Sequence, residues 1–382
     1  MTEIPRAMKA VRFHDRGDLR LQSITPLPCG PDEVRIKVAY CGICGSDLHE
    51  YIAGPLFVPK HGQKHPYNGS KLPVTLGHEI SGVITEVGDG VAPNHLKAGQ
   101  RVFVNPCIRD RQLGVPPCLM CQEGKENLCP RLGFYGLSGP GGGLAESLVV
   151  KAINVFPLPN SVSLKVAALV EPLAVAWHCV RVSGIQSGQD AVVLGAGPIG
   201  LAILMILKVW GARKVVVSEV LPARAALARK FGADCVVNPL EKGGDEDPVV
   251  AKAREFSGGH LGGGAHVSFD ASGIQETLET SIACVRQGGT VLNLAIHEKP
   301  LKLNFNVLTL SEKKLMGGLC YTNEDIEGVI NALANGSLVA DELITSVVTL
   351  EDAIQGAFEE LIHRRENHVK ILVQPNSVED IA

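Results

Sequence analysis

The sequence has little net charge, few aromatic residues and no long stretch free of charged residues. Its 36 lysines and arginines almost balance its 40 aspartates and glutamates, so the net charge is only -4. A protein of this charge lacks the basic surface that binds nucleic acid or an anionic membrane, and we expect neither as a partner. Hydrophobic residues make up 45% and aromatic residues 4% of the chain. This composition is typical of a globular α/β protein and excludes a disordered one.

The longest stretch without a charged residue, 191–207, has only 17 residues. Gly195, Gly197, Pro198 and Gly200 interrupt it, so it is more typical of a strand, a turn and a helix than of a membrane span. We find no signal-peptide core and no lipidation motif, and we therefore expect a cytoplasmic protein with no membrane partner. A length of 382 residues predicts two or three domains.

Two kinds of pattern divide the chain. Before about residue 150, short apolar runs alternate with turns and indicate β-strands at 10–13, 33–38, 81–87 and 101–104. After Glu171, short buried strands alternate with helices, which predicts a doubly wound parallel sheet. We expect strands at 191–194, 214–217, 235–237, 266–269 and 290–294, and helices at 199–211, 222–231 and 275–285. The tail predicts helices at 323–334 and 350–362, and a strand at 370–373 that could pair with the first domain.

A glycine-rich motif follows the strand at 191–194. Gly195-Ala196-Gly197-Pro198-Ile199-Gly200 matches the G-x-G-x-x-G fingerprint of dinucleotide-binding folds, and Glu219 ends the next strand. The glycines allow a tight turn, close approach of the backbone to a pyrophosphate and close helix packing. Glu219 would bind the adenosine ribose and repel a 2'-phosphate, which favours NAD over NADP. Arg224 could instead hold that phosphate, but beside Glu219 it better suits a position flanking the adenine.

Eleven cysteines, an odd number, argue against a disulfide framework in a chain of this length. Four of them, Cys107, Cys118, Cys121 and Cys129, fall in one segment. Four thiolates with no open coordination position are typical of a structural zinc site. The ten-residue spacer after Cys107 makes it the loosest member of this set. Buried free thiols or a redox dithiol are the alternatives, although no thioredoxin-like unit surrounds Cys118 and Cys121.

Three further residues of metal-ligand type are dispersed along the chain, and no spacing rule links them. Cys44 lies in Cys-Gly-Ile-Cys-Gly-Ser-Asp-Leu-His at 41–49, His78 in Gly-His-Glu at 77–79, and Glu171 in Glu-Pro-Leu. Each alone also fits an ordinary role: a core thiol, a hydrogen-bonded histidine and a carboxylate at a helix N-terminus.

In this order, these motifs resemble the zinc-dependent medium-chain alcohol and polyol dehydrogenases over essentially the whole chain. The resemblance rests on 41–49, 77–79, the cysteine cluster, Glu-Pro-Leu-Ala-Val-Ala-Trp-His at 171–178 and the glycine-rich motif. It implies an α/β protein with a Rossmann coenzyme domain at 173–320 and a mostly-β, GroES-like catalytic domain at 1–172 and 321–382. The long insert from Gly54 to Pro73, with 293–295 and 318–322, looks most like the 2,3-butanediol (acetoin) dehydrogenases.

The resemblance implies a catalytic zinc held by Cys44, His78 and Glu171, with Glu79 behind it as a supporting or exchanging carboxylate. Asp47 would fix the tautomer of His78 through its second ring nitrogen. Three protein ligands leave one position for water or the substrate hydroxyl. The ion would lower the pKa of that hydroxyl, and hydride would pass to the nicotinamide of NAD.

Two more residues complete the implied mechanism. Ser46 would take the hydroxyl proton, and His49 would pass it to solvent. The substrate is then a small diol or hydroxyketone, such as 2,3-butanediol, acetoin or diacetyl. The family forms homodimers and homotetramers, so we expect a homo-oligomer.

The chain departs from the family pattern at two places, and several alternative functions fit the sequence. The family's common spacing has two residues between the first two cysteines of the structural site, where this chain has ten, so the occupancy of that site is open. The family also often has Cys where Glu171 stands. The alternative functions are a sorbitol/xylitol-type or L-threonine dehydrogenase, a non-catalytic NAD-binding protein and a zinc-ribbon nucleic-acid module. The last lacks the basic surface it needs.

Overall fold

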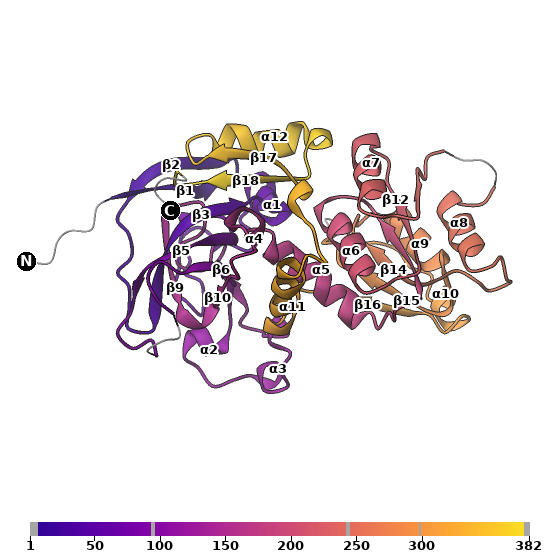
Figure 1. Cartoon of the computed structure of the whole chain (residues 1–382), viewed down its shortest axis with the longest axis horizontal. Coiled ribbons are helices and arrows are strands. Elements are labelled where there is room, and N and C mark those ends of the chain that lie inside the picture. The colour runs from indigo at the N-terminus through magenta and orange to yellow at the C-terminus, as the bar shows by residue number, and fades with distance from the viewer. Residues whose placement is uncertain (1–6, 93–95, 242–244, 298, 378–382) are drawn as a thin grey trace, which may run out of the picture. The chain divides into compact units, whose positions relative to one another are not determined.

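Residues 7–92, 96–241, 245–297 and 299–377 are described by the structure, a computed structural model (Figure 1). The chain divides into two units. One is formed by Met1–Glu171 with Val339–Ala382, and the other by Pro172–Leu338. Within the described ranges, no helix combines the length and the hydropathy needed to cross a membrane.

The unit formed by Pro172–Leu338 is built on a six-stranded, all-parallel sheet. The strand order, β13-β12-β11-β14-β15-β16, is that of a Rossmann fold. The inner strands are short and apolar because helices cover both faces of a parallel sheet. The predicted doubly wound sheet is therefore confirmed. Its strands are β11 (Asp190–Leu194), β12 (Lys214–Ser218), β13 (Cys235–Val237), β14 (Ala265–Asp270), β15 (Val285–Asn293) and β16 (Lys314–Gly317).

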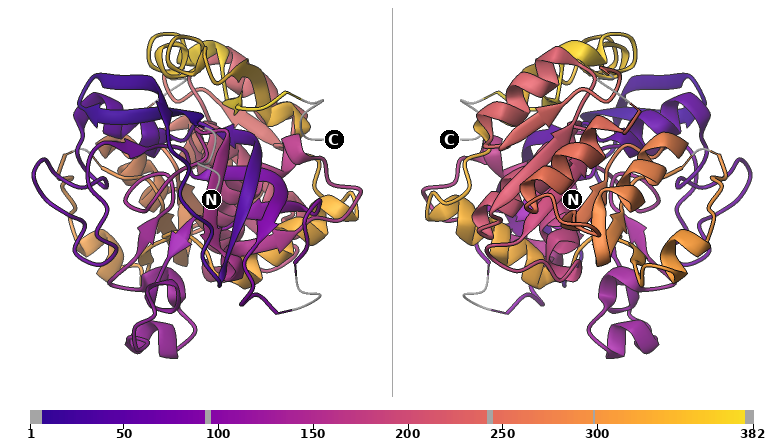
Figure 2. Two further views of the ribbon diagram at one scale, coloured as in Figure 1. Left: turned by 90° about the vertical axis from the view of Figure 1, so that its left-hand side faces the viewer. Right: turned by 90° about the vertical axis from the view of Figure 1, so that its right-hand side faces the viewer.

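Helices cover the two faces of this sheet. α6 and α7 pack together on one face, and α8 and α9 pack together on the other (Figure 1, Figure 2). Val192 of β11 and Val216 of β12 share a buried cluster with Val249 of α8 and Ile282 of α9. The helices are α5 (Val170–Val182), α6 (Pro198–Val209), α7 (Pro222–Lys230), α8 (Pro248–Phe256), α9 (Gln275–Ala283), α10 (Asn306–Thr309) and α11 (Asn323–Ala334).

The other unit is mostly β-structure. Its largest sheet has the order β10-β6-β5-β3-β18-β17, with β9 also paired to β3, and smaller sheets are formed by β2-β1-β4 and β7-β8. Alternate residues of β3, Val34, Ile36 and Val38, enter one hydrophobic core. Its strands are β1 (Met8–Asp15), β2 (Asp18–Ile24), β3 (Glu33–Gly42), β4 (Val74–Thr75), β5 (Glu79–Val87), β6 (Arg101–Val104), β7 (Cys107–Ile108), β8 (Gly133–Phe134), β9 (Ser147–Lys151), β10 (Val155–Pro157), β17 (Ile344–Thr349) and β18 (Lys370–Gln374).

Short helices connect these strands, and the longest of them, α1, directly follows Cys44. The α-helices are α1 (Gly45–Ala53), α2 (Asp110–Leu113), α3 (Leu119–Gln122), α4 (Leu164–Ala167) and α12 (Glu360–His363). Tighter 3-10 turns form η1 (Glu126–Leu128), η2 (Ala152–Asn154), η3 (Asp341–Leu343) and η5 (Arg365–Asn367), and η4 (Ala353–Glu359) is a wider π-type helix.

The end of the chain returns to the first unit. β18 pairs antiparallel with β3, with Leu372 opposite Gly42, so the predicted return of 370–373 is confirmed. The predicted helix at 323–334 is confirmed as α11. The one at 350–362 is only partly correct, because π-type turns occupy 353–359 before α12. The predicted helix at 275–285 ends at Ala283, because Val285 already pairs in β15.

The second boundary between the units follows Leu338, whereas the sequence analysis placed it after residue 320. Helix α11 accounts for the difference. Its fully buried Asp325 accepts a bond from Arg181 Nε at 2.7 Å and lies 2.9 Å from His178 Nδ1, both on α5. Burial alone would raise the pKa of Asp325, but His178 and Arg181 lower it well below its usual range. This cluster anchors α11 within the Rossmann unit.

We expect Asp325→Asn to lower the free energy of unfolding by about 3 kcal/mol, because it leaves the charge of Arg181 without its buried partner. Urea denaturation measures the change. Glu324→Gln is the control, because Glu324 lies 4.0 Å from Arg181 with a side chain 76% exposed. Its effect should stay within about 0.5 kcal/mol. Equal effects of the two substitutions would show that the buried cluster does not anchor α11.

Candidate active site and metal sites

Asp47 connects two of the predicted metal ligands. Its fully buried carboxylate, in the first turn of α1, accepts hydrogen bonds from the backbone N–H of Cys44 at 2.9 Å and of Gly77 at 3.3 Å. Its Oδ1 also lies 3.5 Å from Nδ1 of His78. Asp47 thus holds the Cys44 loop and the His78 segment together, and its position beside Nδ1 leaves Nε2 of His78 as the nitrogen available to a metal.

The surroundings of His78 are strongly negative. Burial alone would lower the pKa of this histidine, but Asp47 and Cys44 raise it well above its ordinary value. The same negative field favours a bound metal cation. Ser46 Oγ lies 3.2 Å from Nε2 of His78. His49 is half-buried further along α1, and its side chain makes no hydrogen bond to any residue that the structure describes.

Glu79 and Lys370 form a buried ion pair behind this group. Lys370 Nζ lies 2.6 Å from Glu79 Oε1 and donates to the carbonyl of Ile43 at 3.0 Å. The other oxygen, Glu79 Oε2, is buried without a hydrogen-bond partner. A Cβ on Gly42 would lie 1.8 Å from that oxygen, so a larger residue at this position would displace the carboxylate. Burial alone would lower the pKa of Lys370, but Glu79, Cys44 and Glu171 raise it.

Glu171 is 7% exposed in the first turn of α5, and its charge acts on Lys370 together with that of Cys44. Within the described residues, however, the ligand atoms of Cys44, His78 and Glu171 do not all lie within 4.8 Å of one another. The structure thus brings Cys44 and His78 into contact and leaves Glu171 further from them. A thiolate, an imidazole and a carboxylate are all zinc ligands, so the donor chemistry fits this metal.

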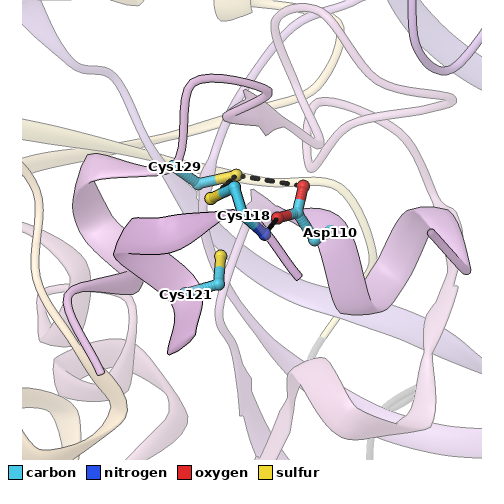
Figure 3. Close-up of side chains that lie close together, drawn as sticks. All are labelled: Asp110, Cys118, Cys121 and Cys129. Atoms are coloured by element: carbon cyan, nitrogen blue, oxygen red, sulfur yellow. Dashed lines mark hydrogen bonds between the residues drawn. The ribbon is translucent and has the colours of Figure 1, made fainter. Parts of the chain in front are cut away.

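A second group of ligand atoms does meet that distance. Asp110, Cys118, Cys121 and Cys129 offer one ligand atom each, all within 4.8 Å of one another. Figure 3 shows the three thiols and the carboxylate facing a common centre, with Cys118 directly before α3 and Asp110 at the start of α2. The sulfurs of Cys118 and Cys129 are 3.9 Å apart. Two thiolates on one tetrahedral zinc are separated by roughly 3.8 Å, so this spacing fits the metal.

Cys107 does not belong to this group, which corrects the predicted ligand set. It lies in β7, where its N–H donates to Asn105 Oδ1 and its carbonyl accepts from Asn154 Nδ2 at 2.8 Å. These bonds fix the backbone of Cys107 in the ribbon of β7 and β8, and the chain brings Asp110 to the thiols instead. Asp110 Oδ1 lies 3.3 Å from the Cys129 sulfur.

The carboxylate of Asp110 is held firmly in place. Its Oδ2 accepts the N–H of Cys118 at 2.6 Å, and its Oδ1 accepts Nε of Arg131 at 2.6 Å. Burial alone would raise the pKa of Asp110, but these bonds lower it far below its usual range, so it is ionised. Burial and its neighbours raise the pKa of Cys121, and burial raises that of Cys129. A bound metal cation would favour the thiolate forms and would offset their negative charge and that of Asp110.

The glycine-rich turn joins β11 to α6. Gly195 has φ 91°, in the region that favours glycine, and a Cβ on Gly200 would lie 1.8 Å from the carbonyl oxygen of Gly195. A Cβ on Gly197 would meet only Arg224 Nη1, at 3.8 Å. Gly197 directly precedes Pro198 and Ile199 in the first turn of α6. The open space beside it suits a phosphate at the helix N-terminus.

Glu219 is fixed at the carboxyl end of β12. Its Oε2 accepts the N–H of Ala196 at 2.7 Å, and its Oε1 accepts the N–H groups of Val220 and Leu221 at 2.8 Å. The side chain is therefore oriented by both the glycine-rich turn and the start of α7. The guanidinium of Arg224 lies on the other side of the turn, near Gly197.

The insert that follows α1 is held by a residue of that helix. Glu50, fully buried, accepts backbone hydrogen bonds from Leu56 at 2.9 Å, from Phe57 and from Val58 at 3.2 Å. A charged acceptor with three backbone donors is a strong anchor. The start of the insert is thus fixed to the helix that carries Ser46.

Sequence reasoning missed Asp110, Lys370 and Glu50. Each is a charged residue that the fold buries completely or nearly so. Lys370 opens an otherwise apolar strand, Lys-Ile-Leu-Val, and a lysine at such a position indicates a buried partner. Asp110 and Glu50 lie among other polar residues, so their local sequences carry no comparable signal.

Comparisons with known proteins cover nearly the whole chain. The family profile for zinc-binding dehydrogenases matches residues 198–335, and that for the alcohol dehydrogenase GroES-like domain matches residues 30–160. The chain is 40% identical to the (R,R)-butanediol dehydrogenase of Saccharomyces cerevisiae, over 97% of this chain and 99% of that protein.

Two solved structures show the same architecture. The 2R,3R-butanediol dehydrogenase from Bacillus subtilis is 37% identical with a TM-score of 0.88, and the match covers 97% of this chain and all of that one, 100%. A zinc-binding dehydrogenase from Sinorhizobium meliloti, bound to NADP, is 29% identical with a TM-score of 0.81, over 97% of this chain and 99% of that one.

The Glu50 anchor predicts a local change in hydrogen exchange. We expect Glu50→Ala to speed exchange of the Leu56, Phe57 and Val58 amides by about tenfold or more, because they lose their acceptor. Mass spectrometry of peptic fragments measures the rates. Glu50→Gln keeps an acceptor oxygen and should give a smaller increase. The control is Glu359→Ala, which removes the acceptor of the hydroxyl of Tyr51, a residue of the same helix as Glu50. Unchanged exchange at 56–58 in Glu50→Ala would exclude the anchor.

Proposed function

Because the chain belongs to the zinc-binding medium-chain dehydrogenase family, we propose that it interconverts a small vicinal diol and its hydroxyketone with NAD. The pair 2,3-butanediol and acetoin exemplifies this substrate class. The observation that carries the proposal is the Asp47 carboxylate, which holds Cys44 and His78 together beside Ser46. Relatives at 37–40% identity are named butanediol dehydrogenases, which supports a diol as the substrate. The insert that Glu50 anchors is the segment whose sequence resembles that group of enzymes.

Cys44, His78 and Glu171 are the residues that we propose to hold the catalytic zinc. When bound, zinc lowers the pKa of a coordinated hydroxyl, and NAD accepts the hydride. Asp47 orients His78 through Nδ1. The ammonium of Lys370 lies within electrostatic reach of both Glu171 and Cys44.

Glu79 supports the site from behind. It is fully buried, and Lys370 takes one of its oxygens. A second hydroxyl of the substrate therefore has no open route to this carboxylate in the described structure. We assign Glu79 the role of balancing Lys370 beneath the Cys44 loop, and look to the insert at 54–73 for the diol preference.

Ser46 and His49 provide the proton path. Ser46 Oγ lies beside Nε2 of His78, so it would be close to a substrate hydroxyl bound near that nitrogen. A serine hydroxyl can accept this proton while donating its own onward. His49 lies one helical turn further along α1 and is half-buried, and an imidazole is a side chain that can pass a proton to solvent.

We propose NAD as the cofactor, held by Gly195, Gly197, Pro198, Ile199 and Gly200 at the N-terminus of α6. The fixed carboxylate of Glu219 favours a ribose with a free 2'-hydroxyl, because a 2'-phosphate beside it would be repelled. Arg224, close to Gly197, suits the pyrophosphate or the adenine side of the cofactor.

A structural zinc on Asp110, Cys118, Cys121 and Cys129 is the second metal that we propose. Its four protein donors leave no open position, as in structural zinc sites. The salt bridge of Arg131 with the buried carboxylate of Asp110, 2.6 Å long, keeps that carboxylate beside the thiols.

We propose a homodimer or homotetramer assembled through the edge of the Rossmann sheet. β16 is the last strand of that sheet, and apolar residues on and beside it are exposed: Phe305, Leu310, Leu315 and Leu319. An uncovered apolar sheet edge is a surface that a second copy can extend or cover.

The substrate proposal is tested by NAD reduction with the three stereoisomers of 2,3-butanediol, sorbitol, xylitol and L-threonine. We expect kcat/KM for one butanediol isomer, (R,R) by analogy with the named relatives, to exceed that for every other compound by about tenfold or more. NADP in place of NAD should give a lower value with the same substrate. Higher turnover of sorbitol or threonine would refute the substrate class.

The proton path predicts that Ser46→Ala lowers the hydride-transfer rate by about 100-fold, because the hydroxyl proton loses its acceptor. Single-turnover NADH formation measures that rate. Zinc content should stay unchanged, and Ser46→Thr should restore much of the rate because it keeps a hydroxyl. A normal rate in Ser46→Ala would remove Ser46 from the path.

The structural site makes opposite predictions for two residues. Asp110→Ala should lose about one zinc per chain, whereas Cys107→Ala should keep it, because only Asp110 lies among the thiols. Metal analysis of the folded protein measures the stoichiometry. Asp110→Cys, which supplies a fourth thiolate, should retain the zinc. Loss of zinc in Cys107→Ala with retention in Asp110→Ala would restore the ligand set expected from the sequence.

A further inference from the structure

A cavity of about 200 Å³ lies within the β-rich unit. Its lining comes from β1, β2, β3, β4 and β9, from the segment before β4 and from the glycine-rich segment 139–142. None of the residues proposed above for zinc, NAD or proton transfer lines it. The volume corresponds to roughly six water-sized units, enough for a small organic molecule.

The charges around this cavity are of one sign. Arg12, Arg35 and Lys71 line it, and no carboxylate does. Glu146 interrupts the run of lining residues at 145–149, but it is not part of the lining, and its carboxylate accepts the N–H of Lys9 at 2.9 Å. The cavity therefore carries positive charge that no residue of its own lining balances.

Arg12 lacks an ionic partner. Its Nη2 donates to the carbonyl of Pro73, and its Nε is buried without an acceptor. No described carboxylate lies within ion-pair distance of its guanidinium, and burial lowers its pKa. Arg35, in contrast, pairs with Glu86 at 2.8 Å and donates to the carbonyl of Leu27. A partly buried guanidinium without a counter-ion is costly, and an anion would offset that cost.

The glycine-rich wall adds hydrogen-bond donors. The backbone N–H groups of Gly141 and Gly142 donate to no acceptor in the described part of the chain. Gly141 has φ 82°, and no side chain at either position shields the backbone. Unpaired amides beside cationic side chains are typical of anion-binding turns. The rest of the lining is largely apolar, with Ile24, Leu27 and Val74 among its members.

We propose that this cavity binds a small organic anion, a carboxylate on a short aliphatic chain. Arg12 and Lys71 pair with the carboxylate, the amides of Gly141 and Gly142 lie within the same wall, and the apolar lining contacts the chain. The lining includes Ser70, Lys71 and Pro73 of the insert but none of the residues proposed to hold zinc or NAD or to transfer the proton, so failure of this site would leave those assignments untouched.

The test is calorimetric titration of the zinc-loaded enzyme, saturated with NADH, with butyrate, its neutral isostere butyramide and inorganic phosphate. We expect butyrate to bind at least about tenfold more tightly than either of the others. Arg12→Gln and Lys71→Gln should each weaken butyrate binding by about tenfold. Lys71 is exposed, so its replacement keeps the test valid if Arg12→Gln does not fold.

The matched control is Lys9→Gln, which removes a cation from the same strand as Arg12 but outside the cavity, where Lys9 pairs with Glu351. It should leave butyrate affinity unchanged, and butyrate should not compete with the diol. Equal affinity in all variants, competition with the diol, or tighter binding of butyramide or phosphate would overturn the proposal. Absence of measurable butyrate binding would overturn it as well.

Discussion

The ion pair between Lys370 and Glu79 is the interaction on which the β-rich unit depends. It joins the first residue of β18 to the first residue of β5, 291 positions apart, and the same ammonium holds the carbonyl of Ile43, directly before Cys44. Removing the partner of a buried charge costs about 3–5 kcal/mol, so separating these two strands would be strongly unfavourable. The end of the chain thereby supports the loop that carries the first proposed metal ligand.

Asp47 also holds the loop that carries Cys44. It takes N–H groups from Cys44 and Gly77 and faces His78, so one carboxylate fixes two segments that the sequence separates. Together, Asp47, Glu79 and Lys370 create a preorganised, largely buried setting in which the side chains of Cys44 and His78 lie side by side. A metal that activates an alcohol requires such a preorganised setting.

Much of this fold followed from local patterns. Short valine-rich runs favour buried strands, and glycines in this pattern favour a tight turn. The sequence therefore predicted β11, β12 and the turn with Gly195 and Gly200. Asp110 was not predictable, because its role depends on how β7 fixes Cys107 away from the thiols. The second boundary between the units, which the sequence predicts after residue 320, depends in the structure on the pairing of Asp325 with His178 and Arg181, a contact between distant segments. The π-type turns at 353–359 likewise break the period that a regular helix obeys.

The central claim is that Asp47 and its neighbours prepare one metal site while Asp110 completes another. Anomalous diffraction at the zinc edge, from crystals of the enzyme purified with zinc, tests both statements in one map. We predict two peaks per chain, one in contact with Cys44 and His78 and one among Asp110, Cys118, Cys121 and Cys129. A map with no peak beside Cys44 and His78 would contradict the account, whatever the second site holds.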